Sequence, residues 1–470
     1  MDDGDFREWA GRAAAWAADY RQGLGDRPVR ASTVPGAIAA ALPAAPPEAA
    51  EPLADLFADF ERIVVPGMTH WQHPRFFAYF PANASPASVI AEVLTAAMGA
   101  QCLLWQTSPA AAEMETVMID WLRQAVGLPA PWRGVIQDSA SSATLCALLT
   151  MRERALDFTG NRRGLAGQAP VRVYASGEVH SSIDKACWIA GIGEDNLVRI
   201  PVRGSRRGLD PLALDAAIRA DRAAGLRPAG VVACVGGTGV GAMDEVDEVV
   251  AVARRHDLFV HVDAAWAGSA MICPEFRPLW AGVAGADSIV LNPHKWLGAQ
   301  FDCSAHFVRD PDQHRRTLAI QPEYLKTHGK EGIVDYSEWS IQTGRRFRAL
   351  KLWFVLRAHG LEGLRGMIRN HVRWAQALAA RIAAAPGFSL AAEPVLSLFA
   401  FRHDPGDGRD GDQHMLALLQ AINDGGRIYL TPTRVDGRLA IRFQAGAMST
   451  TEADVASAFD VICDAAQALG

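Results

Sequence analysis

The 470-residue sequence predicts an α/β fold whose main sheet is largely parallel. Between about residues 85 and 360, short apolar runs rich in β-branched residues alternate with helical patterns. Each run is followed by a loop and then by a helix-like segment, as in strands joined by crossover helices. Half of the residues are hydrophobic, which suits a globular protein long enough for two or three domains.

The first segment, residues 1–84, reads as helices interrupted by proline-rich turns. Trp9, Ala13, Trp16 and Tyr20 recur at helical spacing and form an apolar stripe. A short helical segment cannot bury such a stripe alone, so we expect it to need a partner surface.

The second segment, residues 85–360, contains most of the predicted strands, and the third, residues 361–470, is expected to form a small α+β domain. The predicted strands are Gly134–Gln137, Val171–Ala175, Gly230–Val235, Leu258–Val262, Ser288–Leu291, Leu396–Phe401 and Leu439–Gln444. The long amphipathic helices expected in the third segment are Gly363–Ala385 and Asp412–Asp424.

Charge and composition make several classes of partner unexpected. The net charge is −6, from 46 basic and 52 acidic residues without a basic arm, so neither nucleic acid nor an anionic membrane is expected. The seven cysteines are scattered, which is typical of a reducing compartment. No run approaches the roughly 18 consecutive apolar residues of a membrane span. The acidic N-terminus lacks the basic region followed by an apolar region that is typical of a signal peptide. We therefore expect a cytoplasmic protein, and we expect no metal.

Two predicted strands end in residues of complementary chemistry. The run from Leu258 ends at Asp263, and the run from Ser288 leads to Lys295 between a histidine and a tryptophan. Partial desolvation lowers the pKa of such a lysine and favours a Schiff base, while a carboxylate can protonate a pyridine nitrogen. Together they predict a pyridoxal-phosphate (PLP) site, although each alone could be a solvated lysine or a helix cap.

The segment Gly237–Ala242 offers a competing interpretation. It fits the pattern G-x-G-x-x-A after a strand, and Asp263 ends the next strand, as in a dinucleotide-binding fold. That interpretation leaves Lys295 unexplained, and no second mononucleotide-binding half is visible. The same glycines also suit a turn that brings Thr238 close to a flat cofactor.

Other polar and aromatic segments follow or precede these strands. Gln137–Thr144 follows a strand and opens a helix, which predicts either an anion site or an ordinary helix cap. His180 follows another strand and could stack on a cofactor ring. Trp71–Pro81 is unusually aromatic and could wall a pocket. Gln321–Gly332 reads as a surface loop that presents Tyr324.

These residues resemble the group II PLP-dependent decarboxylases, particularly aromatic-L-amino-acid decarboxylase, over roughly residues 60 to 465. Asn-Pro-His-Lys-Trp after a strand, downstream of His-Val-Asp-Ala-Ala, is the most specific part of the resemblance. The similar blocks are His73–Pro81, Ser108–Leu122, Gly134–Ser141, His261–Phe276, Asn292–Ser304 and Gly344–Val355. Departures from the animal members' pattern fall at Gln101, Leu103, Asp138 and Gly237.

The resemblance implies a role for each matching residue. Lys295 would form the internal aldimine, Asp263 would pair with the pyridine nitrogen, and Tyr324 would protonate Cα from the neighbouring subunit. His180 and Ala265 would cover the two faces of the ring, with Thr238 near its O3′. The phosphate would be held by Ser139, Ala140, Asn292 and His294. The side-chain pocket would be lined by Trp71, Tyr79, Phe80 and Leu103.

The resemblance also implies an aspartate-aminotransferase-like architecture (fold type I) and a homodimer with shared active sites. The expected reaction is decarboxylation of tryptophan, phenylalanine, tyrosine or DOPA to the arylalkylamine, through an external aldimine and a quinonoid. Alternatives within the family are an aromatic aldehyde synthase or a decarboxylase of another amino acid. A non-catalytic PLP-binding protein is a further alternative.

Overall fold

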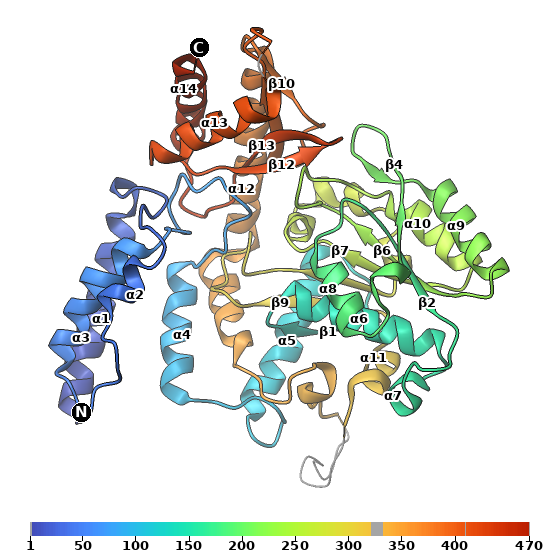
Figure 1. Ribbon diagram of the computed structural model, residues 1–470. Helices are drawn as coiled ribbons and strands as arrows, with labels where there is room; N and C mark the ends of the chain where they lie inside the picture. Colours follow the sequence, from blue (N-terminus) through green and yellow to red (C-terminus); the bar gives the residue numbers. More distant parts are fainter. Residues whose placement is uncertain (1, 321–331, 409, 470) are drawn as a thin grey trace.

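The computed structural model describes residues 2–320, 332–408 and 410–469, which form a seven-stranded sheet, a four-stranded sheet and an N-terminal helical segment (Figure 1). The helices are α1 (Asp3–Gln22), α2 (Ala37–Ala41), α3 (Leu53–Asp59), α4 (Pro86–Met98), α5 (Pro109–Val126), α6 (Ala140–Ala155), α7 (Gly160–Arg163), α8 (Ser182–Ile189), α9 (Pro211–Ala223), α10 (Val246–Arg255), α11 (Pro311–Leu318), α12 (Arg348–Ala384), α13 (Gly411–Asp424) and α14 (Glu452–Ala468).

The central sheet has the strand order β1-β9-β8-β7-β6-β2-β3. Its strands are β1 (Arg133–Gln137), β2 (Val171–Ser176), β3 (Leu197–Ile200), β6 (Arg227–Cys234), β7 (Phe259–Asp263), β8 (Ser288–Leu291) and β9 (Ser304–Val308). The pairs from β8 through β3 are parallel, whereas β9 is antiparallel to both of its neighbours. The predicted α/β class with a largely parallel sheet is confirmed.

Helices cover both faces of this sheet, because alternate residues of each strand point to opposite sides. Val231 and Val260 join the core that includes residues of α5, α9 and α10. Val173 and Val232 join the core on the other face, with residues of α6 and α8. Strands buried on both faces read as continuous apolar runs, which is why the sequence reveals them.

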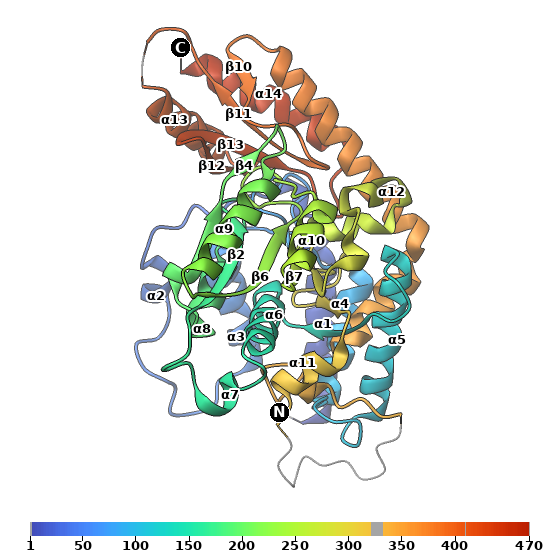
Figure 2. The ribbon, with the colours of Figure 1, turned by 90° about the vertical axis from the view of Figure 1, so that its right-hand side faces the viewer.

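The C-terminal part of the chain forms a second core around the four-stranded sheet, in the antiparallel order β10-β11-β13-β12. Its strands are β10 (Phe388–Leu390), β11 (Leu398–His403), β12 (Thr431–Val435) and β13 (Arg438–Gln444), and a separate hairpin pairs β4 (Val202–Arg203) with β5 (Gly208–Leu209). Helix α12 extends from the central-sheet region to this second core (Figure 2). It is interrupted at Gly360, whose φ of 61° and ψ of 163° are not helical.

The N-terminal helices stand beside α4, apart from the central sheet (Figure 1). Helix α1 contains no buried residue, and its stripe packs only in part, with Trp9 at 5.7 Å from Phe57 and Trp16 at 4.8 Å from Phe60, between ring centroids. Much of this segment's apolar surface therefore stays accessible in a single chain.

Among the described helices, none has the length and apolar character needed to cross a membrane.

Candidate active site

Five strand ends of the central sheet meet at one edge, where polar residues follow β1, β2, β6, β7 and β8. Because the carboxyl ends of parallel strands share an edge, residues far apart in sequence are brought together there. They surround a cavity of about 120 Å³. Its lining residues are Ser139, Ala140, Ser141, His180, Ser182, Cys234, Gly236, Thr238, Asp263, Ala265, Trp266, Asn292 and Lys295.

Lys295 follows β8 and lies in this cavity. Asn83 fixes its backbone by donating from Nδ2 to the Lys295 carbonyl at 2.7 Å. Burial lowers the pKa of the amine to about 8, an effect that Asp263 opposes and Arg442 reinforces. A substantial fraction of the amine is therefore neutral near pH 7–8, as a Schiff-base nucleophile requires.

Asp263 ends β7, the parallel neighbour of β8, and its side chain is only 6% exposed. Its Oδ1 accepts a hydrogen bond from the Ala265 N–H at 3.1 Å, which leaves Oδ2 available to the cavity. No regular helix begins at this position, so a helix cap does not explain the carboxylate.

His180 stands at the cavity after β2 with a defined orientation of its ring. The N–H of Ser182 donates to Nδ1 at 3.1 Å, and the Ser182 hydroxyl lies 2.9 Å from the same nitrogen. Desolvation against the pocket lowers the pKa of His180, although Asp263 opposes this. A neutral imidazole that accepts at Nδ1 carries its proton on Nε2.

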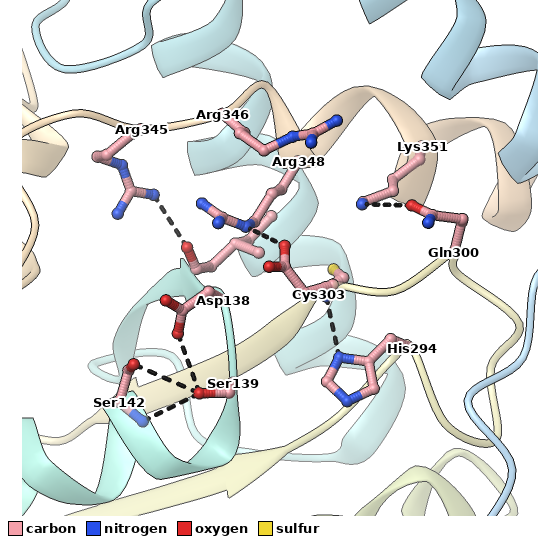
Figure 3. A network of polar contacts seen from close by, with 12 residues as sticks. Asp138, Ser139, Ser142, His294, Gln300, Cys303, Arg345, Arg346, Arg348 and Lys351 are labelled. Atoms are coloured by element: carbon pink, nitrogen blue, oxygen red, sulfur yellow. Dashed lines mark hydrogen bonds and ion pairs between the residues drawn. The ribbon is translucent and has the colours of Figure 1, made fainter. Parts of the chain in front are cut away.

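Helix α6 begins at Ala140, and its amino end faces the cavity. Ser139 is the N-cap, and its Oγ accepts from the Ser142 N–H at 3.2 Å. The first-turn N–H groups have no partner within a helix, so they are suited to bind an anion. Both oxygens of the Asp138 carboxylate are already hydrogen-bonded, because Oδ1 accepts from the Ser139 hydroxyl (Figure 3) and Oδ2 accepts from Gln342 Nε2.

Asn292 and His294 follow β8 and each has one orientation fixed by a neighbour. The Ser304 hydroxyl donates to Asn292 Oδ1 at 2.6 Å, which leaves the amide N–H groups as donors. The Cys303 N–H donates to His294 Nδ1 at 2.9 Å, so the neutral ring is protonated at Nε2. Burial lowers the pKa of His294 to about 3.

Basic side chains at the start of α12 lie close to this anion-binding end (Figure 3). Arg345, Arg348 and Lys351 each have a nitrogen 2.5–2.8 Å from a carboxylate oxygen. Because these charges are paired, the donors left for an anion are mainly the neutral groups of α6, Asn292 and His294.

The cavity fits PLP in shape and in chemistry. Gly236 has a φ of 94°, and a Cβ there would lie 2.5 Å from the Ala267 Cβ, so only glycine leaves room for this turn. The amine of Lys295, the carboxylate of Asp263 and the donors of α6 supply groups for an aldehyde, a pyridine nitrogen and a phosphate. Eight of the nine predicted cofactor residues line the cavity; the ninth, His294, does not, although it lies in sequence between the lining residues Asn292 and Lys295.

The predicted substrate residues are less close together. Phe80 stacks on Trp266, a lining residue, with ring centroids 5.3 Å apart. Trp71 and Tyr79 stack on each other at 5.6 Å but are 39% and 46% exposed. Leu103 lies in the loop between α4 and α5 and does not line the cavity of its own chain. Tyr324 lies outside the described residues.

Arg442 is a site residue that the sequence did not reveal. It lies in β13, is 4% exposed, and its Nε has no hydrogen-bond partner in the described structure. Its charge lowers the pKa of Lys295, and burial lowers the pKa of Arg442 itself to about 10. The sequence does not reveal this position, because an arginine in an alternating strand is usually solvent-exposed. Arg442 is buried because its strand, β13, belongs to the second core and lies near the site of the first.

Comparison with known proteins agrees with this chemistry. The pyridoxal-dependent decarboxylase conserved domain matches residues 35–404. Aromatic-L-amino-acid decarboxylase of Sus scrofa is 40% identical over 94% of this chain and 92% of that protein. Phenylacetaldehyde synthase of Arabidopsis thaliana is 36% identical over 100% and 97%. A crystal structure of Oryza sativa TDC with PLP and tryptamine has a TM-score of 0.96 and 37% identity, covering 100% and 99%.

The fold and the site define a PLP enzyme of fold type I. The chain belongs to the pyridoxal-dependent decarboxylase family and is a PLP-dependent carboxy-lyase. The dinucleotide interpretation of Gly237–Ala242 is therefore wrong, since Thr238 of this segment and the preceding Gly236 line the PLP cavity.

Proposed function

We propose that this enzyme converts an aromatic L-amino acid to the arylalkylamine and CO₂. The observation that carries the proposal is the stack of Phe80 on Trp266, which extends an aromatic surface to the rim of the PLP cavity. Tryptophan, phenylalanine, tyrosine and DOPA offer the flat rings that such a surface binds. The names of the relatives, one of them a decarboxylase of aromatic amino acids, support the same substrate class.

The charges near the pocket favour the α-carboxylate of a substrate but not a second carboxylate on its side chain. The positive charge of the buried Arg442 acts on Lys295 in the cavity, so it favours the α-carboxylate of an incoming amino acid there. Arg75, the charged residue of the aromatic stretch, instead bonds to the carbonyls of Arg427 and Gly25. An acidic side chain would be desolvated without a partner, at a cost of several kcal/mol. Glutamate should therefore be a poor substrate.

Each site residue has a role in this proposal. PLP, when bound, supplies a ring that accepts the electrons left by the loss of CO₂. Lys295 provides the amine that binds the cofactor and later releases the product, and Asp263 holds a proton on the ring nitrogen. His180 and Ala265 enclose the ring, with Thr238 beside it. Tyr324 would return a proton to Cα. The phosphate donors are Ser139, Ala140, Asn292 and His294.

We further propose a homodimer in which residues 1–84 and helix α4 contribute to the interface. Ile90, Val93 and Met98 on α4 are 57%, 63% and 56% exposed, an unusual density of large apolar side chains for a solvated helix. The Leu103 loop follows this helix, so a second copy could bring Leu103 to its partner's cavity. Residues 85–360 would form the PLP domain and 361–470 the small domain of a cytoplasmic enzyme.

An aldehyde synthase is the second candidate, because one relative is a phenylacetaldehyde synthase. Protonation of Cα competes with oxidation by O₂, so the outcome depends on the acid that delivers the proton. The chain has Tyr324 for this role by resemblance and His180 at the cavity. Tyr324→Phe should shift the products from amine towards aldehyde, ammonia and peroxide. An unchanged product ratio would assign the proton delivery to another group.

The test of the substrate class is a comparison of kcat/KM for tryptophan, phenylalanine, tyrosine, DOPA, histidine and glutamate under one condition. The proposal expects at least one aromatic substrate to exceed glutamate by about 100-fold or more, since an unpaired carboxylate costs several kcal/mol. Glutamate exceeding every aromatic substrate would overturn it.

A further inference from the structure

The loop that carries His180 is anchored at two points. On its carboxyl side, Ser182 fixes the His180 ring through Nδ1 within the first turn of α8. On its amino side, Glu178 accepts a hydrogen bond from Arg207 Nε at 2.7 Å. The side chains of Glu178 and Arg207 are only 17% and 18% exposed, so solvent screens this ion pair weakly.

Arg207 lies in the turn between β4 and β5, and its guanidinium reaches a second carboxylate. Its Nη1 donates to Asp436 Oδ1 at 2.9 Å. Asp436 forms the turn between β12 and β13 in the small domain. One guanidinium therefore joins the His180 loop of the PLP domain to a hairpin that belongs to the other core.

The same hairpin rests on the loop that carries Thr238. Val240 packs with Ala400, Val435 and Ala440 in a small apolar cluster of its own. A Cβ on Gly239 would lie 3.1 Å from the Thr433 Oγ1, which shows how closely β12 approaches the loop. The hairpin thus contacts the rim of the PLP cavity at the Thr238 loop, while Arg207 connects it to the His180 loop.

We propose that Arg207 is a positioning residue that sets His180 over the cofactor by tying Glu178 to Asp436. The inference rests on the proposed role of His180 as the residue that covers the ring. Through Arg207, the position of the β12–β13 hairpin determines how firmly the His180 loop is held. A guanidinium is required because it donates to two carboxylates from different nitrogens, which a single ammonium group cannot reproduce in the same geometry.

The adjacent residue provides a matched control. Arg206 also bridges the same turn to the small domain, with Nε 3.1 Å from Glu393 Oε1. Its ion pair, with side chains 46% and 38% exposed, is more exposed than the Arg207–Glu178 pair and comparable with the Arg207–Asp436 pair, in which Asp436 is 75% exposed. No hydrogen bond or ion pair joins the Arg206 side chain to the described His180 loop. Arg206→Gln therefore removes an interdomain ion pair of the same type without releasing Glu178.

The first experiment compares Arg207→Gln, Arg207→Lys and Arg206→Gln with the parent enzyme. Amide hydrogen exchange of the apoenzyme over residues 177–182 should accelerate in Arg207→Gln. The PLP dissociation constant should rise about tenfold, because the variant loses charge-assisted hydrogen bonds. The visible circular dichroism of bound PLP should change. Arg207→Lys should recover only part of the loss, and Arg206→Gln should match the parent in all three measurements.

The second experiment is a double-mutant cycle with Glu178→Gln and Asp436→Asn. These carboxylates both bond to Arg207, so their effects on PLP affinity should be coupled in the parent and independent in Arg207→Gln. The inference is wrong if Arg207→Gln equals Arg206→Gln in exchange and affinity, or if no coupling exists. Failure of the parent to decarboxylate aromatic substrates would refute the proposed function but would leave these comparisons interpretable.

Discussion

Asp263 ends one strand and Lys295 follows its parallel neighbour, and the carboxylate opposes the effect of burial on the pKa of the amine. Asp263 pairs with Val290 across β7 and β8, and Lys295 follows β8 into the same cavity. Burial alone would depress the pKa of Lys295 further, and the nearby negative charge limits the fall to about 8. The cavity thus holds an amine that is reactive at neutral pH beside the acid that a pyridine nitrogen requires.

The first prediction concerns the identity of the reactive amine. Lys295→Ala should lose the visible absorbance of the protein–PLP Schiff base and nearly all turnover, because no other lysine lines the described cavity. Lys185→Ala, which removes an exposed lysine from α8, is the control and should keep both properties. Retention of the absorbance in Lys295→Ala would assign the Schiff base to another residue.

The second prediction concerns the pKa of Lys295 in the apoenzyme. Asp263 raises this pKa and Arg442 lowers it, so Asp263→Asn should move it below about 8 and Arg442→Gln should move it above. Competitive labelling of amines over a pH series, read by mass spectrometry at Lys295, measures both shifts. Shifts of the same sign in the two variants would show that the charges do not act as described.

The third prediction concerns stability in acid. Burial lowers the pKa values of His261, His314 and His371 to about 4, whereas an unfolded histidine titrates near 6.5. Below pH 6.5 the unfolded chain binds protons that the folded chain does not, so stability is lost progressively between pH 6.5 and 4. Each residue contributes roughly 3 kcal/mol to this loss.

Urea unfolding of the apoenzyme at pH 7.5, 6 and 5 checks this prediction, with His371→Gln for comparison. Trp296 Nε1 donates to His371 Nδ1 at 3.0 Å, and a glutamine carbonyl can accept the same bond without titrating. The free energy of unfolding should therefore fall less in the variant than in the parent between pH 7.5 and 5. If the free energy of unfolding depends on pH identically in the two proteins, His371 does not contribute to the loss of stability in acid.

The fourth prediction concerns the exposed face of α4. Val93→Glu should shift the enzyme from dimer to monomer in sedimentation and lower its activity, because Val93 is 63% exposed within an apolar face. Leu212→Glu alters an even more exposed apolar residue on α9, at 77%, and should leave the assembly unchanged. A Val93→Glu dimer with full activity would place the interface elsewhere.

Local sequence patterns were sufficient for the strands that carry the site, since strands buried on both faces are continuous apolar runs. The same rule failed for β9, because His306 interrupts its apolar run with a polar side chain, although it is fully buried. Helix α6 begins at Ala140, within the polar segment Gln137–Thr144 that was predicted to open a helix, because Ser139 caps it and small residues fill its first turn.

Contacts between distant segments were not predictable in this way. Arg442 acts on Lys295 because the four-stranded sheet packs near the end of the central sheet, and Arg207 joins the His180 loop to the β12–β13 turn through the same packing. The resemblance to the family predicted most of the residues that line the cavity. Leu103 does not line the cavity of its own chain, so its role in the substrate pocket of a dimer stays a prediction.

The most direct test of the central claim is the stoichiometry of products formed by the PLP-loaded enzyme from carboxyl-labelled L-tryptophan, L-phenylalanine and L-tyrosine. The account predicts that, for at least one of these substrates, labelled CO₂ and the arylalkylamine appear in equal amounts, without peroxide, and that Lys295→Ala yields neither. Release of CO₂ with aldehyde and peroxide in place of amine, or no release of CO₂ from any of the three, would contradict it.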